Sequence, residues 1–208
     1  MNQSLIQTLK KDHPDVTLIM ASKYLTAEEM KPYVAAGIHD FGENRVDAFL
    51  EKKRALKASV TWHFIGTLQS KKVKKVIHEV DVLHTLDRVK LIETVNHLRS
   101  TPIDAFIQFN ISKEPSKHGF SPEDLDPVIK ALKQAPMIHP IGVMGMAEAT
   151  PDRSRIAAQF DTLVSLKNTL QKEFSSLSQL SMGMSDDYDI ALEKGTTHLR
   201  LGRILLEE

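Results

Sequence analysis

Short apolar runs of strand-like composition alternate with longer helical patterns along the whole chain of 208 residues, and this alternation constrains the fold more than any other feature. Such a layout is typical of parallel strands joined by crossover helices. We expect eight strands, over residues 16–22, 38–41, 61–65, 81–85, 103–111, 138–146, 177–182 and 197–201. Eight consecutive βα repeats predict an α/β protein, a single (β/α)₈ TIM barrel, with an open doubly wound sheet as the alternative.

The segments between the expected strands carry helix-boundary signals. Thr26 and Glu29 have the spacing of a capping box, and Gly37 ends the helix that follows. Ser121 and Pro122 predict an N-cap and a first helical residue for a helix over 122–133. We expect the other helices over 2–11, 46–56, 70–79, 88–98, 152–174 and 186–194. No linker or low-complexity segment interrupts the pattern, which predicts one domain over residues 1–208.

Composition excludes several classes of protein. The 27 basic and 27 acidic side chains cancel, so no overall field attracts nucleic acid or anionic lipid. The chain has no cysteine, which removes disulfides, thiolate zinc sites and cysteine nucleophiles. The polar N-terminus is unlike a signal peptide, and no window approaches the roughly 20 apolar residues of a membrane helix. We therefore expect a cytoplasmic monomer that binds neither nucleic acid nor membrane.

The remaining charge and metal signals are weak. Lys71, Lys72, Lys74 and Lys75 form a basic run on an expected helix, which we interpret as a solvated face because no aromatic residues are interleaved with it. A docking surface for a partner enzyme is the alternative for this run. The nine histidines show no compact metal-ligand spacing, so no metal site is expected.

The expected functional groups follow the strands, because the carboxyl ends of parallel barrel strands form the open rim. Residues 181–186 and 199–203 each pass from a strand through a glycine toward a helix. Free N–H groups at such turns bind anions, and barrels commonly hold phosphate after their seventh and eighth strands. The alternative is that Gly183 and Gly202 serve only to end strands and begin turns.

Lys23 directly follows the first expected strand and allows two interpretations. It is either an ordinary rim lysine with its ammonium in water or a Schiff-base lysine. The second needs a neutral amine, which the apolar run VTLIMAS before Lys23 would favour by supplying apolar walls. A Schiff-base lysine beside a phosphate site suits pyridoxal phosphate binding or sugar-phosphate aldol chemistry.

Five segments together resemble one family in order and spacing. They are ASK at 21–23, FGENRV at 41–46, WHFIGTLQSKK at 62–72, SKHGF at 116–120 and LSMGMSDDY at 180–188. The chain resembles the pyridoxal phosphate homeostasis protein family, which is related to the N-terminal barrel domain of alanine racemase. The resemblance covers nearly the whole chain. It departs from the family in a shorter N-terminal stretch and in Arg203, where a small residue is usual.

The resemblance implies a set of residues around pyridoxal 5′-phosphate (PLP). It implies a Schiff base on Lys23, phosphate contacts from Ser185 and Gly202 with backbone help from Met184 and Arg203, and a pyridine ring near Asn44 and Arg200. Of the histidines, His63 on the third strand is the one expected to face the cofactor. An arginine beside the ring nitrogen disfavours its protonation, which weakens the ring as an electron sink.

The resemblance also implies a binding and regulatory role in intracellular PLP homeostasis without catalytic turnover, and PLP-dependent apoenzymes as partners. Only five residues follow Arg203, so we expect no second, β-rich domain of the kind that completes a racemase site. One alternative is a PLP enzyme with weak racemase or lyase activity, with Lys117 or His118 as its acid/base group. The other alternative is a Schiff-base aldolase that uses no cofactor.

Overall fold

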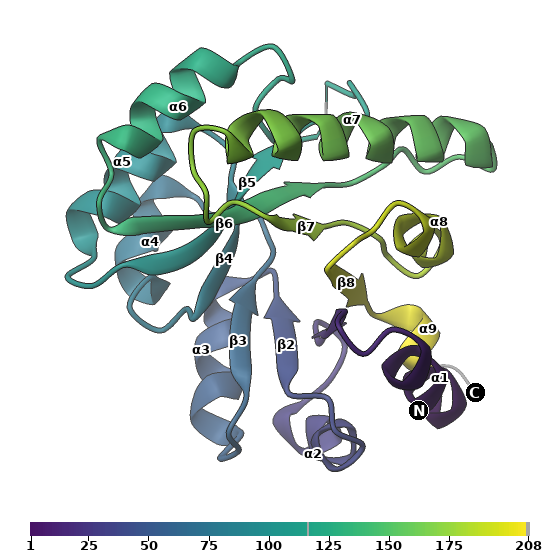
Figure 1. Cartoon of the computed structure of the whole chain (residues 1–208). Helices are drawn as coiled ribbons and strands as arrows, with labels where there is room; N and C mark the ends of the chain where they lie inside the picture. Colours follow the sequence, from purple (N-terminus) through teal and green to yellow (C-terminus); the bar gives the residue numbers. More distant parts are fainter. Residues whose placement is uncertain (116, 207–208) are drawn as a thin grey trace.

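The computed structural model describes residues 1–115 and 117–206, and it is a closed barrel of eight parallel strands in sequence order (Figure 1). The strands are β1 Thr17–Ala21, β2 Asp40–Glu43, β3 Thr61–Phe64, β4 Val82–Leu86, β5 Ile103–Phe109, β6 Ile138–Gly145, β7 Gln179–Ser181 and β8 His198–Leu201. The helices are α1 Gln3–Asp12, α2 Ala27–Ala35, α3 Val46–Ala55, α4 Ser70–Val76, α5 Val89–Leu98, α6 Leu125–Lys133, α7 Arg153–Gln171, α8 Tyr188–Glu193 and α9 Arg203–Leu206. The predicted barrel is confirmed, and the open sheet is wrong because β1 pairs with both β2 and β8.

Several predicted boundaries differ from the structure by two or three residues, and two of these differences have a clear local cause. Strand β2 begins two residues later than expected because the N–H of Ile38 still bonds to the carbonyl of Tyr33, which closes helix α2 through the left-handed Gly37 (φ 84°). The helix expected from Pro122 begins at Leu125, with Asp124 as its N-cap. Ser121 instead bonds to the side chains of Glu123 and Asp124 in a turn, so it caps no helix. The capping box of Thr26 and Glu29 is confirmed.

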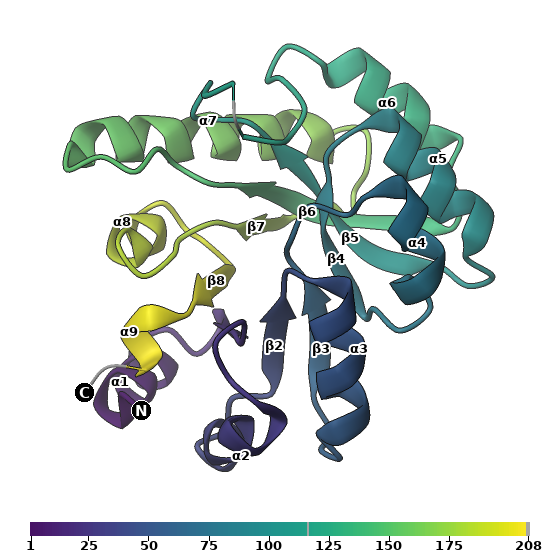
Figure 2. The same cartoon turned by 180° about the vertical axis from the view of Figure 1, so that it is seen from behind.

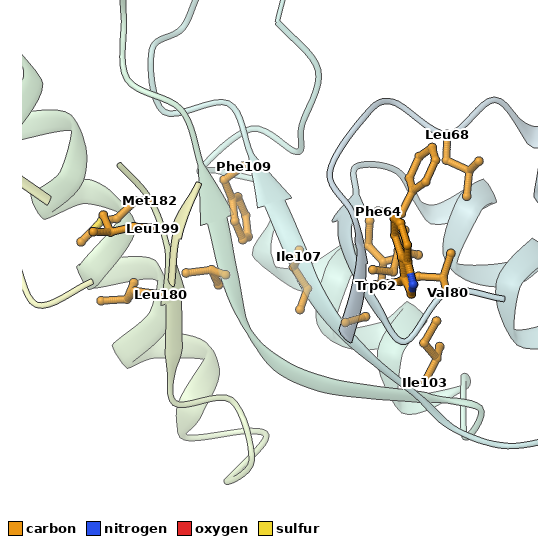
Figure 3. Close-up of a cluster of buried hydrophobic side chains, with 14 of the residues drawn as sticks. Trp62, Phe64, Leu68, Val80, Ile103, Ile107, Phe109, Leu180, Met182 and Leu199 are labelled. Carbon is orange, nitrogen blue, oxygen red and sulfur yellow. The ribbon is translucent and has the colours of Figure 1, made fainter. Parts of the chain in front are cut away.

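Helices surround the strands (Figures 1 and 2), and the main hydrophobic core lies between the two layers. Trp62 and Phe64 on β3 point outward (Figure 3). The ring of Trp62 lies 5.4 Å from that of Phe49 on α3. Leu180, Met182 and Leu199 fill the corresponding layer outside β7 and β8 (Figure 3). On α4, Val73 and Val76 are buried while Lys71, Lys74 and Lys75 are exposed, as expected for a solvated basic face.

The barrel interior is more polar than the layer outside it. Successive strand residues face opposite sides of a sheet, so the residues that alternate with the outward apolar side chains point inward. The inward apolar cluster is small and is formed by Phe106, Ile141 and Met144. Polar side chains fill much of the remaining interior: His63, His84, Ser181, His198 and Arg200 are all buried.

The two chain ends of the described structure lie side by side at the barrel rim (Figures 1 and 2). The N–H of Asn2 bonds to the carbonyl of Leu205 at 2.9 Å, and the hydroxyl of Tyr33 donates to the same carbonyl. Helix α1 thereby fixes the position of α9, which follows the eighth strand. No described helix is both long and apolar enough to cross a bilayer. Within residues 1–115 and 117–206, no group of three or more histidine or acidic side chains is arranged to hold a metal ion.

Candidate cofactor site

A pocket of about 500 Å³ opens at the carboxyl ends of β1 and β8. Its volume falls within the range of small-molecule sites. It brings together six of the predicted site residues: Lys23, Met184, Ser185, Arg200, Gly202 and Arg203. Ala21, Tyr24, Asp186 and Leu206 complete its lining. A lysine from the first strand end therefore shares one pocket with the two glycine loops, which we define as residues 182–187 and 201–203.

Lys23 lies in a turn that begins where β1 ends. The N–H of Leu25 bonds to the carbonyl of Ser22 at 2.9 Å, and the Lys23 ammonium lies 4.6 Å from the centroid of the Tyr24 ring. Lys23 and Tyr24 are exposed. Of the apolar run expected to form walls around Lys23, Ala21 lines the pocket, whereas the side chains of Leu18, Ile19 and Met20 are buried within the barrel wall and its core.

A buried ion pair holds the backbone just before Lys23. Lys52 on α3 donates to the carboxylate of Glu43 and to the carbonyl of Ser22, the latter at 2.6 Å. The hydroxyl of Ser22 also donates to Glu43, at 2.9 Å. Because the Glu43 side chain has no exposed surface, Lys52 compensates an otherwise buried charge. This Ser22–Glu43–Lys52 cluster ties the turn that carries Lys23 to strand β2 and helix α3.

The first glycine loop is folded by Asp187. Its carboxylate accepts from the N–H of Met184 at 2.6 Å, and Gly183 adopts a left-handed conformation (φ 95°). Burial raises the pKa of Asp187. Ser185 accepts a 3.3 Å hydrogen bond at Oγ from the N–H of Ile204, which joins the two loops. Across the described residues, the N–H groups of Ser185 and Asp186 donate to no protein acceptor, so they remain free for an anion.

Helix dipoles contribute less to this anion site than expected. Helices α8 and α9 contain six and four residues, so few peptide dipoles align behind either loop. The free N–H groups and the Ser185 hydroxyl are the main donors instead.

Gly202 distinguishes the two interpretations of the loop glycines. Gly183 is required by the fold, because its φ is positive and a Cβ would lie 2.6 Å from Ala191 and Leu199. Gly202 has no positive φ, and among the described residues a Cβ there would meet only Ala21, at 3.5 Å or more. Neither backbone conformation nor packing within the chain requires glycine at 202. Its place in the pocket lining supports a close approach by a ligand.

Arg200 reaches the pocket from within the barrel and is 5% exposed. Its guanidinium donates to Ser181 Oγ at 2.6 Å and to the carbonyl of Gly145 at 3.1 Å. Burial lowers the pKa of Arg200 to about 10, with Asp187 opposing the shift. The side chain remains a cation at neutral pH. Arg203, the departure from the family pattern, forms an ion pair with Asp186 at the mouth of the pocket.

Asn44 and His63 lie outside this pocket. Asn44 is exposed at the end of β2, in a separate hollow with Thr67 and Lys72. His63 is 2% exposed inside the barrel, where both ring nitrogens contact other side chains, at His84 and Asp40. Contact of Asn44 or His63 with the cofactor stays a prediction.

The two acid/base candidates also lie away from Lys23. Lys117 donates to the carbonyl of Ala147 and pairs with Glu114, and His118 lies 3.8 Å from Asp87. Among the described residues that line the Lys23 pocket, neither appears. Ser116 of the SKHGF segment lies outside the described residues, as do residues 207 and 208 of the expected domain.

Four residues that support the pocket were not predicted from the sequence: Glu43, Lys52, His84, and Ser181 as a partner of Arg200. The alternation of polar and apolar residues in HLRL indicates that His198 and Arg200 share one face of the eighth strand, but VLHTL at 82–86 does not alternate and carries no such signal for His84. Nothing in the sequence indicates that Lys52 is buried, because its neighbours Lys53 and Arg54 look the same.

Residues 4–207 match the family model described as alanine racemase, N-terminal domain. The chain is 36% identical over 203 residues to the pyridoxal phosphate homeostasis protein of Pseudomonas aeruginosa, covering 96% of this chain and 87% of that relative. The chain belongs to the pyridoxal phosphate homeostasis protein family. The protein of the same name from Aquifex aeolicus is 34% identical over 196 residues, covering 92% of this chain and 86% of the relative.

Solved structures agree with this family and its fold. PipY of Synechococcus elongatus, solved without PLP, superposes with a TM-score of 0.93 at 29% identity and full coverage of both chains. PipY with PLP bound gives a TM-score of 0.89 at 28% identity, covering 99% of this chain and 100% of PipY. Alanine racemase of Clostridium difficile shares only the fold, at 13% identity and a TM-score of 0.78, and this chain spans 56% of its length.

Proposed function

We propose that this member of the pyridoxal phosphate homeostasis protein family binds PLP reversibly in the pocket at the ends of β1 and β8. The observation that carries the proposal is the convergence of an amine, free N–H donors and a buried cation in that one pocket. The names of the relatives and the PLP-bound structure of PipY support it. The homeostatic role of the relatives is the biological role we propose for this chain.

The residues present fit the chemistry of the cofactor. The phosphate would be held by Ser185 Oγ and the free N–H groups of Ser185 and Asp186, in the open space beside Gly202. The backbone of Arg203 is a further predicted contact, and a contact from Met184 would require its N–H to leave the Asp187 carboxylate. Arg200 would lie near the pyridine ring as a fixed cation. When bound, the cofactor supplies an aldehyde that reacts with amines.

Lys23 supplies the amine. Lys23 Nζ would hold the cofactor aldehyde through a C=N bond, with the carbonyl oxygen released as water. Water would reverse this bond and release the cofactor. Exposure of Lys23 to solvent suits such exchange.

We propose binding without catalytic turnover. Besides Lys23, the acid/base side chains among the described lining residues are Asp186, which is paired with Arg203, and the exposed Tyr24, whose ring lies beside the Lys23 ammonium. PLP-dependent apoenzymes are the proposed recipients, with the protein acting as a monomer in the cytoplasm. A PLP enzyme with weak racemase or lyase activity is the second candidate function, favoured only by the shared fold with alanine racemase.

Spectrophotometric titration with PLP tests the binding proposal. The unmodified protein should develop a visible absorption band at one equivalent, and Lys23→Ala should not. Lys31→Ala is the matched control, because Lys31 is an exposed lysine on α2 whose partner is Glu28. A band that survives in Lys23→Ala would overturn the assignment of the lysine. A protein that never develops the band would instead favour the aldolase without cofactor.

Incubation of the PLP-loaded protein with single-enantiomer amino acids separates binding from catalysis. We expect no more inverted amino acid than there is protein. Racemisation beyond that stoichiometry, lost in Lys23→Ala and kept in Lys31→Ala, would show turnover and contradict the non-catalytic role.

A further inference from the structure

Five inward-facing side chains form one continuous chain of hydrogen bonds through the barrel. Arg200 Nη1 lies 2.6 Å from Ser181 Oγ, which lies 2.9 Å from His84 Nδ1. His84 Nε2 lies 2.9 Å from His63 Nδ1, and His63 Nε2 lies 2.9 Å from Asp40 Oδ1. The members come from β8, β7, β4, β3 and β2. We call this set the interior chain.

Hydrogen-bonding chemistry fixes the direction of the interior chain. A guanidinium only donates, so Ser181 Oγ accepts from Arg200 and gives its own proton to His84 Nδ1. Neutral His84 then carries its proton on Nε2 and donates to His63 Nδ1. His63 in turn donates from Nε2 to the carboxylate of Asp40. In each of the four hydrogen bonds, the donor therefore lies on the Arg200 side and the acceptor on the Asp40 side.

The surroundings keep His84 neutral, as this arrangement requires. A second proton on His84 would leave it with no acceptor nitrogen for Ser181. His84 has no exposed surface and stacks on Phe106 at 4.4 Å. Burial, followed by His63, His198 and Arg200, lowers the pKa of His84 well below its ordinary value. The stacking and the two hydrogen bonds hold the ring in one orientation.

The interior chain joins two pockets at opposite ends of the barrel. Arg200 lines the carboxyl-end pocket with Lys23. Asp40 lines a second pocket of about 260 Å³ at the amino ends of β1 and β2, together with Asp15 and Thr17. The Asp40 side chain is 28% exposed there. A solvent-accessible carboxylate at one end of the barrel is thus connected to a buried cation at the other.

We propose that Asp40, His63, His84 and Ser181 are positioning residues for the cofactor site, and that they fix the Arg200 guanidinium for the pyridine ring of PLP. The inference rests on the proposed PLP function and extends it to a residue at the far end of the barrel. Ser181 and the Gly145 carbonyl each accept one N–H of Arg200, which sets the plane of the guanidinium. Asp40 orients the chain because its charge favours donation toward itself.

Asp40→Asn tests the proposal at a distance from the pocket. The amide oxygen of asparagine can still accept from His63, so the substitution removes the charge and keeps an acceptor. We expect affinity for PLP to fall at least about fivefold, the lower end of typical coupling between sites, and the visible band of the bound cofactor to shift. Asp15→Asn is the matched control, since Asp15 is an exposed carboxylate of the same pocket outside the interior chain. Equal affinities and spectra for the two variants would overturn the proposal.

Nitrogen-15 NMR of histidine in the unmodified, PLP-free protein tests the direction of the chain without a substitution. The rings of His84 and His63 should both carry their proton on Nε2 and leave Nδ1 as the acceptor. A proton on Nδ1 of either ring, or a charged His84, would contradict the inference. This measurement needs no cofactor, so it tests the interior chain even if the protein binds no PLP. Failure to bind PLP in the titration would instead refute the proposed function.

Discussion

Gly202 illustrates how a single residue can reflect a ligand rather than the fold. Glycine loses more backbone entropy on folding than any other residue, which lowers stability. It is therefore normally found where φ is positive or where a Cβ would not fit. Gly183 meets both conditions, and Gly202 meets neither. The sequence places glycines in both loops but cannot distinguish these cases, because the difference depends on what the Cβ would meet in space.

Gly202→Ala should therefore weaken binding without harming the fold. The added methyl group meets only Ala21 within the chain but occupies the pocket, so we expect PLP affinity to fall about tenfold or more, or about 1.4 kcal/mol. The free energy of unfolding of the PLP-free protein should change by less than about 1 kcal/mol, because the backbone conformation suits alanine. Unchanged affinity in the titration would show that the glycine serves only the turn.

At the scale of elements, the sequence predicts all eight strands and misplaces some of their ends. Strand β2 is shifted because the closing hydrogen bond of α2 occupies Ile38, and α6 starts late because Ser121 bonds within its own turn. Both errors come from local hydrogen bonds that compete with the expected ones. The Ser22–Glu43–Lys52 cluster could not be predicted from the sequence either, since it depends on how α3 packs beside β1 and β2.

Removing one partner of this cluster should strongly destabilise the fold. Lys52→Met keeps most of the side-chain volume but leaves the Glu43 carboxylate buried without a counter-charge, which typically costs about 3–5 kcal/mol. Urea unfolding should show that loss, whereas the neighbouring Lys53→Met, which breaks a more exposed pair with Glu79, should cost less than about 1 kcal/mol. Similar midpoints for both variants would show that the cluster is not stabilising.

At the scale of the whole molecule, the alternation of strands and helices was enough to predict the barrel and the rim on which the pocket lies. It did not predict the polar interior, because barrel interiors are usually filled by branched apolar side chains. Three histidines occupy that space here, with His63, His84 and His198 in mutual ring contact. Because these histidines are buried, the free energy of unfolding should depend on pH.

His198 gives this dependence a measurable size. Burial, followed by repulsion from His63, lowers its pKa from 6.5 to about 4 in the folded protein. Above pH 6.5 both folded and unfolded states are neutral at this residue, so its contribution is fully present. Between pH 6.5 and 4 only the unfolded state gains the proton, so stability falls by about 3 kcal/mol.

The free energy of unfolding of the PLP-free protein, measured from pH 7 to 4, should therefore fall more steeply than that of His198→Gln. The two curves should differ in slope mainly below pH 6.5. Parallel curves across this range would contradict a neutral, buried His198.

The most direct test of the central claim is mass spectrometry of the PLP-loaded protein after reduction with borohydride. Reduction converts a C=N bond into a stable C–N bond, so the modified lysine survives digestion and can be located. We predict one cofactor adduct per chain, on the peptide that contains Lys23. An adduct confined to another lysine, or no adduct at saturating PLP, would contradict the assignment of this pocket.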